Sequence, residues 1–450
     1  MADLLDALRD ALTRTHVRWL LGILLLGLIL RVVWIANVQP DPRDGRFDDS
    51  VWYFHTGRLL ADGEGYVFPG EAFCQFGNGI QCDERPAAAL WAPGYPLALA
   101  ATFLLPGDDA AAARTLNVVA GLAMIIAVYY LGQRLWDRRA GLLAAAIVAV
   151  FPSQIFFSSL VITETLFAAL AMVLLALAAA WTFERDVSWP KLVALGVVAG
   201  ALAMVRPEGA VFASVIVLAW LIARRSWRLV GQHAALLVLG MALLFVPWAV
   251  RNAIQLDAAV VGTTGLGQVL VQAHHPAADG SPDFFIVAQL WYEYDDIALP
   301  ERQVLVNNEG VREALTYAVS HPRRELGLVP DRFAAFYRGD RGAIVWNQVE
   351  AGSGERALSE SWEGRWGLFS DVFYYAVIGV AVITLPFWLR RMRAWHWLLL
   401  GPFLAYSAMW AFVFVGEPRY HAPLLPIFAL LAAIGLAALL RPFDRLSSRA

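Results

Sequence analysis

The sequence predicts an all-α polytopic membrane protein with about ten transmembrane helices. Of its 450 residues, 59% are hydrophobic and only 16% are charged, whereas a soluble domain carries about 25% charged residues. Its 18 tryptophans fit a protein with two membrane interfaces, where indole rings lie at the level of the headgroups. The net charge of -3 gives no argument for nucleic acid as a partner. We therefore expect most of the chain to lie in a bilayer, among membrane lipids.

Ten apolar segments approach the roughly 20 residues that a helix needs to cross a bilayer. They cover residues 17–38, 115–135, 140–157, 163–181, 192–205, 210–223, 233–250, 372–389, 395–415 and 422–440. The fifth and sixth segments are short, so we expect a tight hairpin that turns at residues 206–209. An eleventh stretch, residues 87–105, is interrupted by Pro93, Gly94 and Pro96. There we expect an interfacial helix of the first outer loop and not a span.

The distribution of arginine predicts which side of the membrane each loop faces, because cytoplasmic loops are enriched in basic residues. If the N-terminus is cytoplasmic, the basic clusters fall on the cytoplasmic side. These clusters occupy residues 9–18, 134–139, 185–191, 224–228, 390–393 and 441–449. The short outer turns contain only Arg206 and Arg419. We therefore expect a multi-pass protein of the plasma (inner) membrane with both termini in the cytoplasm.

This topology divides the chain into three parts. They are residues 1–250, a transmembrane half that includes a first outer loop at 39–114; residues 251–371, a long extracytoplasmic loop before the eighth span; and residues 372–450, the C-terminal transmembrane helices. Loops of this length in a compact protein are usually functional. The long loop also has the helical patterning of a soluble protein at residues 301–320 and 323–337.

Both cysteines of the chain, Cys74 and Cys82, fall in the first outer loop. Disulfides persist outside the cytoplasm, and the predicted topology places this loop there. We therefore expect a disulfide between the two residues, with two unrelated thiols as the alternative.

Acidic residues at the membrane boundary are the first candidates for chemistry. Asp48 and Asp49 follow the first span, where a carboxylate stays ionised and can accept a proton from a hydroxyl. Glu164 opens the fourth span on the same side, and a charge at membrane depth is often functional. The alternative for all three is helix capping, because acidic residues are favoured at the start of a helix.

Two arginines on the outer side are candidates for binding a phosphate, because a guanidinium fork matches phosphate oxygens. Arg419 lies in a proline-containing turn between the last two spans, and Arg206 lies in the short hairpin. The alternatives are a surface salt bridge between Arg419 and Glu417, and a pair between Arg206 and Glu208.

Aromatic and histidine residues of the outer loops are further candidates. Trp91 and Tyr95 could stack on a sugar or a lipid, or could anchor the loop at the interface. His274 and His275 could bind a divalent metal, although adjacent histidines in a polar loop are more often solvated. The sequence contains no phosphate-cradling glycine motif, Cys/His zinc pattern or nucleophile elbow.

Taken in order, these features resemble the polyprenyl-phosphate-sugar-dependent glycosyltransferases of the GT-C fold. In particular, the chain is similar to the protein mannosyltransferase family 39, including the aminoarabinose transferases and the rhizobial core-sugar transferases. The resemblance covers roughly residues 17–440. It is carried by the spacing of Asp49 and Tyr53 and by the motifs LLADGEGY at 59–66, WAPGYP at 91–96, DRRAG at 137–141, TE at 163–164 and PRY at 418–420.

The resemblance implies an inverting transferase that moves a sugar from a polyprenyl-phosphate donor to a lipid, glycan or protein acceptor on the extracytoplasmic face. Asp49 would be the catalytic base, with Asp48 beside it and Glu164 assisting, in a catalytic half formed by residues 1–250. The residues that would bind the donor phosphate are Arg85, Arg206, Arg419 and Tyr420. The residues that would line the substrate site are Tyr53, Trp91 and Tyr95. No cofactor is required by this chemistry, and a divalent metal stays possible.

Two other classes of protein also fit ten spans with outer arginines. A transporter or lipid flippase would contact lipid phosphates, but alternating access needs polar groups near the midplane. Most of the predicted spans have no ionisable residue there, and the candidate residues gather on one side. An O-antigen ligase or polymerase is the other alternative, because such an enzyme also has a large outer loop.

Overall fold

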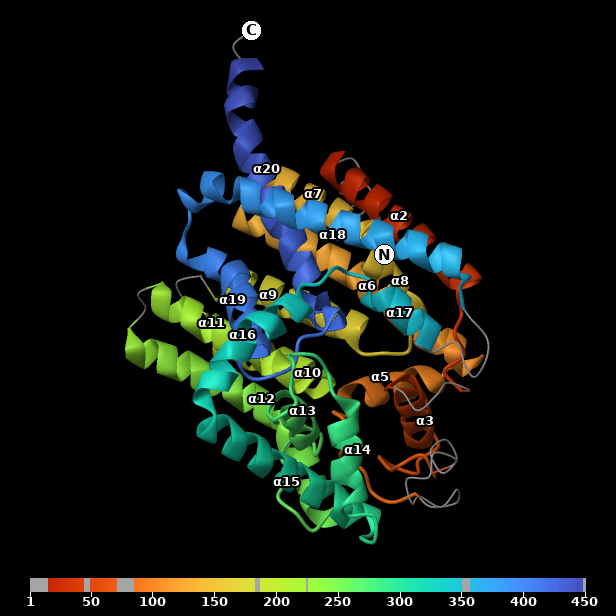
Figure 1. Ribbon diagram of the computed structural model, residues 1–450. Helices are drawn as coiled ribbons and strands as arrows, with labels where there is room; N and C mark the ends of the chain where they lie inside the picture. The colour runs from red at the N-terminus through yellow and green to blue at the C-terminus, as the bar shows by residue number, and fades with distance from the viewer. Residues whose placement is uncertain are drawn as a thin grey trace.

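The computed structural model describes residues 15–43, 49–70, 85–182, 187–223, 226–349 and 357–447. This part of the chain is all-helical (Figure 1), and its only extended pairing is an isolated bridge between Val67 and Ala87. The predicted fold class is therefore confirmed at the level of an all-α membrane protein.

Six helical segments of the described residues are long and apolar enough to cross a membrane, or seven if one bent pair counts as a single span. The six are α2 (Thr15–Asn37), α6 (Asp109–Leu135), α9 (Glu164–Trp181), α12 (Trp227–Gln255), α18 (Glu360–Leu389) and the segment Pro418–Leu440, which comprises η5 (Pro418–Leu424) and most of α20 (Leu425–Ser447). Three further apolar helices are shorter: α10 (Trp189–Val205), α11 (Ala210–Ile222) and α19 (Trp397–Phe412). All ten predicted apolar segments are thus helical, and the count of ten spans stays a prediction.

The third predicted span, residues 140–157, is not one continuous helix. It consists of α7 (Arg138–Ala149) and α8 (Pro152–Phe156), which with the following turn are bent by 58°. Phe151 has an extended ψ of 117°, as expected for a residue before proline. Pro152 also lacks the N–H that would continue the helix.

Arg31 of α2 lies at this break and was not singled out from the sequence. Its side chain is fully buried, and Nη1 donates to the carbonyl oxygens of Gly27, at 3.0 Å, and Ala149, at 3.4 Å. Ala149 is the last residue of α7, so its carbonyl has no partner within the helix. A side chain at Gly121 would come within 2.6 Å of Arg31 Nε. The arginine therefore acts as a cap for α7 across a closely packed contact.

The first outer loop contains α3 (Asp49–Ala61) and α5 (Gly94–Phe103), which pack against each other. A Cβ at Gly57 of α3 would come within 2.9 Å of Leu99 in α5, so only glycine allows this approach. A helix is confirmed within the predicted stretch 87–105, but α5 covers only Gly94–Phe103, and its position at the membrane interface stays a prediction. The start of α5 lies against the end of α10, which brings the first outer loop to the predicted hairpin.

The long outer segment is helical, as its patterning predicts. It contains α13 (Leu266–Ala273), α14 (Phe284–Tyr292), α15 (Leu299–Ser320), α16 (Pro322–Phe336) and α17 (Gly342–Val349). The buried side chain of Gln303 ties it to the first outer loop, since Oε1 accepts from Ala89 N and Nε2 donates to Ala87 O, each at 2.8 Å. In Figure 1, α13, α14 and α15 lie at the end of the molecule opposite the projecting end of α20.

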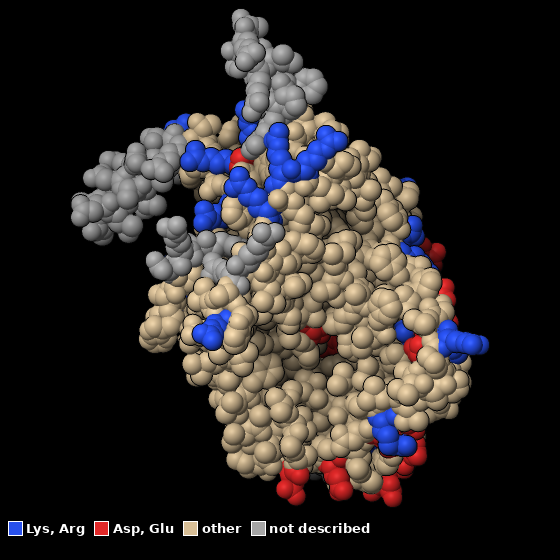
Figure 2. Space-filling view, turned by 90° about the vertical axis from the view of Figure 1, so that its left-hand side faces the viewer, with Lys and Arg blue, Asp and Glu red and all other residues tan. Residues whose placement is uncertain are grey.

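Charged side chains are unevenly distributed along the long axis of the molecule. On the face shown in Figure 2, Lys and Arg gather toward the end from which α20 projects, whereas Asp and Glu gather at the opposite end. The same face is hollowed near its centre, and acidic atoms are visible at the bottom of the hollow.

Candidate functional site

Two arginines and four carboxylates meet where the first outer loop, the α10–α11 hairpin and the η5 turn converge. We call this set the charged cluster; its members are Asp49, Glu164, Arg206, Glu208, Glu417 and Arg419. Four of these residues were predicted as site residues, and the other two were predicted as ion-pair partners. The structure therefore brings together residues from both ends of the chain.

Glu164 lies at the centre of the charged cluster. It is 2% exposed and occupies the first turn of α9, where the helix N-terminus stabilises a negative charge. Its Oε1 atom lies 3.0 Å from Nη1 of Arg206 and 3.9 Å from Nε of Arg419. Helix capping alone therefore does not account for Glu164, because the same carboxylate also pairs with both arginines.

Arg206 is held in the hairpin by two carboxylates. Its Nε atom lies 2.5 Å from Oε1 of Glu208, in addition to the contact with Glu164. The predicted pair with Glu208 is confirmed, but it is not the only partner. Burial alone would lower the pKa of Arg206, but Glu208 and Glu164 raise the pKa well above its ordinary value. The guanidinium is therefore always charged.

The alternative of a salt bridge between Arg419 and Glu417 is confirmed as a pair, but the pair is not at the surface, because Arg419 is only 8% exposed. Its Nη1 atom lies 2.8 Å from Oδ2 of Asp49, and its Nε atom lies 3.4 Å from Oε1 of Glu417. Neither of these nitrogens is aligned in a hydrogen bond. Trp346 of α17 lies under the guanidinium, with 3.8 Å between Cζ and the ring centroid, and donates from Nε1 to Glu417 Oε1 at 3.2 Å. A buried guanidinium with two unaligned donors is suited to gripping an anion.

The ring of Tyr420 lies near both guanidinium groups. Its ring centroid is 5.4 Å from Cζ of Arg206 and 5.2 Å from Cζ of Arg419. Trp410 stacks on the ring at 4.2 Å with an interplanar angle of 17°. An aromatic face stabilises nearby positive charge, so Tyr420 helps two like charges to lie in one site.

The predicted substrate-lining residues are packed beside the charged cluster with little exposure. Tyr53 and Tyr95 are 7% and 0% exposed, and their rings meet edge to face at 5.3 Å. Burial, and then the charge of Asp49, raises the pKa of Tyr53 well above its ordinary value. Trp91 is half-buried, and its carbonyl oxygen accepts from the Tyr66 hydroxyl at 2.9 Å.

Arg85 has a different environment from the other predicted phosphate ligands. It pairs with Glu64 in the first outer loop, and its side chain is 33% exposed. The ion pairs that hold the charged cluster together are made without it. Asp48, Cys74 and Cys82 lie outside the described residues, so their predicted roles stay predictions.

His274 and His275 are buried, at 8% and 6% exposure, so the alternative of solvated histidines is wrong. The Nδ1 atom of His274 lies 2.8 Å from Glu325, and the Nε2 atom of His275 lies 3.6 Å from Asp283. Burial lowers the pKa of His275 below its ordinary value. Among the described residues, no group of three or more His, Cys, Asp or Glu side chains is arranged to hold a metal ion. The possible divalent metal stays a prediction.

Trp346 is the residue that sequence reasoning missed in this site. Its helix lies in the long outer segment, far from Arg419 along the chain. No local motif links the two positions, so only the folded structure could reveal the contact.

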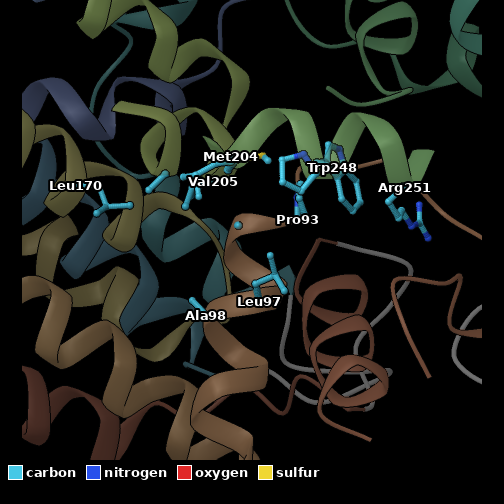
Figure 3. Close-up of a pocket in the computed structure, with 12 residues that line it drawn as sticks. Pro93, Leu97, Ala98, Leu170, Met204, Val205, Trp248 and Arg251 are labelled. Carbon is cyan, nitrogen blue, oxygen red and sulfur yellow. The ribbon is translucent and has the colours of Figure 1, made fainter. Parts of the chain in front are cut away.

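A separate, mostly apolar cavity of about 490 Å³ lies among α5, α9, α10 and α12. Figure 3 shows Leu97 and Ala98 on one side of this cavity, Met204 and Val205 on another, and Arg251 at one end. The guanidinium of Arg251 donates from Nη1 to Ala88 O at 2.6 Å. The cavity thus has apolar walls with a single charged side chain among its lining residues.

Comparisons with known proteins agree with the resemblance found in the sequence. Residues 90–250 match the family described as dolichyl-phosphate-mannose-protein mannosyltransferase. This segment includes Glu164 and Arg206 but not Asp49 or Arg419. No curated protein matches the chain.

Among solved structures, the archaeal oligosaccharyltransferase AglB from Archaeoglobus fulgidus, in complex with an inhibitory peptide and a dolichol-phosphate, is similar with a TM-score of 0.55 and 14% identity. The match covers 98% of this chain and 52% of that one. The same oligosaccharyltransferase tethered with an acceptor peptide has a TM-score of 0.55 and 13% identity, covering 96% and 51%. ArnT from Cupriavidus metallidurans bound to undecaprenyl phosphate has a TM-score of 0.44 and 13% identity, covering 94% and 78%.

The chain spans about half the length of the archaeal oligosaccharyltransferase and shares its fold. The family match covers the region from α5 to α12, where three of the predicted motifs lie. Together, these findings confirm the predicted resemblance of this chain to the GT-C-fold glycosyltransferases, through the dolichyl-phosphate-mannose-protein mannosyltransferase family.

Proposed function

We propose that this protein is a membrane glycosyltransferase that moves a sugar from a polyprenyl-phosphate donor to an acceptor on the extracytoplasmic face. The observation that carries the proposal is the contact between Arg419 and Asp49, at 2.8 Å. A candidate phosphate ligand and a candidate base therefore lie in one site, although they come from opposite ends of the chain. The archaeal enzyme with a dolichol-phosphate in its structure supports this choice of donor by analogy of fold.

In the proposed reaction, Asp49 takes the proton of the acceptor hydroxyl. The hydroxyl oxygen attacks the anomeric carbon from the face opposite the phosphate, and the bond between that carbon and the phosphate oxygen breaks. The bonding electrons leave with the polyprenyl phosphate. Because the attack comes from the opposite face, the configuration at the sugar is inverted. Asp49 is suited to the role because its side chain is still 22% exposed and a carboxylate can accept the proton of a hydroxyl.

Arg419 and Arg206 stabilise the phosphate as it leaves. Negative charge develops on the phosphate when the sugar departs, and fixed guanidinium groups stabilise such charge without reorganisation. For this to happen, Arg419 exchanges its contact with Asp49 for one with the phosphate. The exchange also releases the carboxylate to act as a base. Glu164 keeps both arginines in place while this occurs.

The membrane arrangement in this proposal is the predicted one, with ten spans and both termini in the cytoplasm. The distribution of charge in Figure 2 supports it, because the basic end matches the positive-inside rule. The acceptor, whether a lipid, a glycan or a protein, would approach from the side of the long outer segment.

The experiment that tests the proposal uses purified protein in detergent or nanodiscs, polyprenyl-phosphate sugars and a panel of acceptors. Transfer is followed by mass spectrometry of the acceptor and by release of polyprenyl phosphate. The acceptors for the panel are chosen by comparing the membrane lipids and surface glycans of cells with and without the protein. The proposal is rejected if no lipid-phosphate sugar is consumed while the protein is folded and the cellular glycans are unchanged.

A further inference from the structure

The long outer segment holds the turn that carries Arg419 through a buried histidine. His421, which follows Arg419 by two positions in η5, is fully buried. Its Nδ1 atom lies 2.7 Å from the carbonyl oxygen of Phe336, and its Nε2 atom lies 3.2 Å from Oδ1 of Asp340. A Cβ at Gly342 would come within 3.1 Å of Arg419 N, so the two backbones lie directly against each other. The long outer segment therefore contacts the turn at Arg419 itself and two residues after it.

The two hydrogen bonds of His421 limit the protonation states that the imidazole and the Asp340 carboxyl group can have together. A neutral imidazole has one N–H, and the carbonyl oxygen of Phe336 can only accept. Both bonds therefore need either an imidazolium beside the Asp340 carboxylate or a neutral imidazole beside a protonated Asp340. In either form the pair carries no net charge, which suits side chains that are 0% and 4% exposed. Burial raises the pKa of Asp340 above its ordinary value, in keeping with this shared proton.

Neighbouring side chains prevent the imidazole ring from turning. Tyr374 of α18 stacks on His421 at 4.8 Å with an interplanar angle of 13°, and the ring of Tyr337 is also parallel, at 6.3 Å. Ser370 donates to Oδ2 of Asp340 at 3.2 Å and to its carbonyl oxygen at 2.8 Å. The pair thus joins η5 to α16 and α18 in one rigid arrangement.

We propose that Asp340 and His421 are a positioning pair, which holds the η5 turn so that the guanidinium of Arg419 stays where it can contact the donor phosphate. The inference rests on the proposed function. The pair acts through the backbone between His421 and Arg419. Its loss should therefore raise the KM for the lipid-phosphate donor, because a misplaced Arg419 weakens donor binding. It should also lower kcat, because Arg419 stabilises the phosphate as it leaves.

Two substitutions at Asp340 separate this role from a general effect on folding. Asp340→Asn supplies an amide N–H to Nε2 of a neutral His421, while its oxygen still accepts from Ser370. This variant should keep the donor KM of the wild type. Asp340→Leu leaves His421 Nε2 unbonded, so donor binding must then supply the free energy that places the η5 turn. The donor KM should therefore rise about tenfold, the equivalent of one buried hydrogen bond. If Asp340→Leu fails to fold, His421→Phe replaces it, because phenylalanine keeps the ring packing and removes both nitrogens.

His396→Gln is the matched control. His396 is also buried, at 2% exposure, and its Nε2 atom bonds to the carbonyl of Leu135, 3.1 Å away and outside the charged cluster. This substitution should lower thermal stability and leave the donor KM unchanged. A structural role for Asp340 predicts the same behaviour for Asp340→Leu, so the donor KM decides between the two roles.

The measurements are donor titrations of purified wild type and variants, with native mass spectrometry of bound polyprenyl monophosphate as the second readout. The expected result is weaker binding and higher donor KM in Asp340→Leu or His421→Phe, and neither in Asp340→Asn or His396→Gln. Unchanged donor KM in the disruptive variant that folds, with the wild type active, would overturn the positioning role alone. A wild type that neither binds polyprenyl phosphate nor transfers sugar would reject the proposed function, and this inference with it.

Discussion

Arg419 and Asp49 come from opposite ends of the chain, yet the Nη1 atom of one lies 2.8 Å from the Oδ2 atom of the other. Each therefore sets the electrostatic environment of its partner. A substitution at either residue changes two properties at once, the charge available to the donor phosphate and the freedom of the base. Kinetic tests of this site must therefore report kcat and the donor KM separately.

We expect Asp49→Asn to abolish transfer while folding and membrane insertion are kept. Asparagine retains the shape and is a good N-terminal residue for α3, but it cannot accept the proton of the acceptor. Loss of a general base typically costs about 10²–10⁴ in rate, or roughly 3–5 kcal/mol of barrier. The measurement is turnover of purified variants with a lipid-linked donor.

Asp48→Asn is the control for this prediction and should be milder. Normal turnover by Asp49→Asn together with an inactive Asp48→Asn would mean that the base is one residue earlier. Full activity in both variants would show that the proposed mechanism is wrong. A role for Asp49 in helix capping alone predicts a nearly silent Asp49→Asn.

We expect Arg419→Lys to raise the donor KM strongly and not to restore wild-type kinetics. A lysine keeps the positive charge but not the planar fork that grips two phosphate oxygens. Lysine also loses the flat contact between the guanidinium and Trp346. Donor titrations of the purified variant test this prediction.

Arg58→Lys is a suitable comparison, because Arg58 pairs with Asp62 and Asp109 near the surface and its side chain is 44% exposed. Its kinetics should equal those of the wild type. Wild-type donor KM in Arg419→Lys would reject the proposed role of Arg419.

We expect Glu164→Gln to destabilise the protein as well as to weaken donor binding. The substitution removes the carboxylate that Arg206 and Arg419 share, while Glu208 still pairs with Arg206 and Asp49 and Glu417 still pair with Arg419. The loss should therefore be smaller than the roughly 3–5 kcal/mol that an unpaired buried charge costs. Thermal unfolding in detergent should report the loss. The double variant Glu164→Gln/Arg206→Gln should lose less stability than the sum of the single variants. Strictly additive losses would mean that the two side chains do not interact.

We expect Cys74 and Cys82 to form a disulfide. Alkylation of the denatured, non-reduced protein should then label neither residue, and reduction before alkylation should expose both. Labelling of both thiols without reduction would disprove the bond.

The sequence allowed the apolar helices and the shared side of the charged residues to be predicted. The positive-inside rule assigns Asp49, Glu164, Arg206 and Arg419 to one face of the membrane, because each follows or precedes a span of predicted direction. It does not assign distances between them. That Glu164 Oε1 contacts both arginines depends on how α9, the hairpin and η5 pack, which no local pattern encodes.

Two other features were beyond sequence reasoning for different reasons. Pro152 predicts the break in the third apolar segment. The apolar composition of residues 140–157, however, favoured a single span. The place of Trp346 under Arg419 had no signal at all, because contacts between distant segments arise from tertiary packing alone.

Arg31 gives the first span an unusual relation to its neighbours. Only 17% of the apolar window of α2 is buried, so most of this helix faces outward. Yet the arginine in it is fully enclosed and bonded to the end of α7. On its own in a bilayer, α2 would expose a costly charge. We therefore expect stable insertion of α2 to depend on α7, which is synthesised later and whose last carbonyl accepts a hydrogen bond from this arginine.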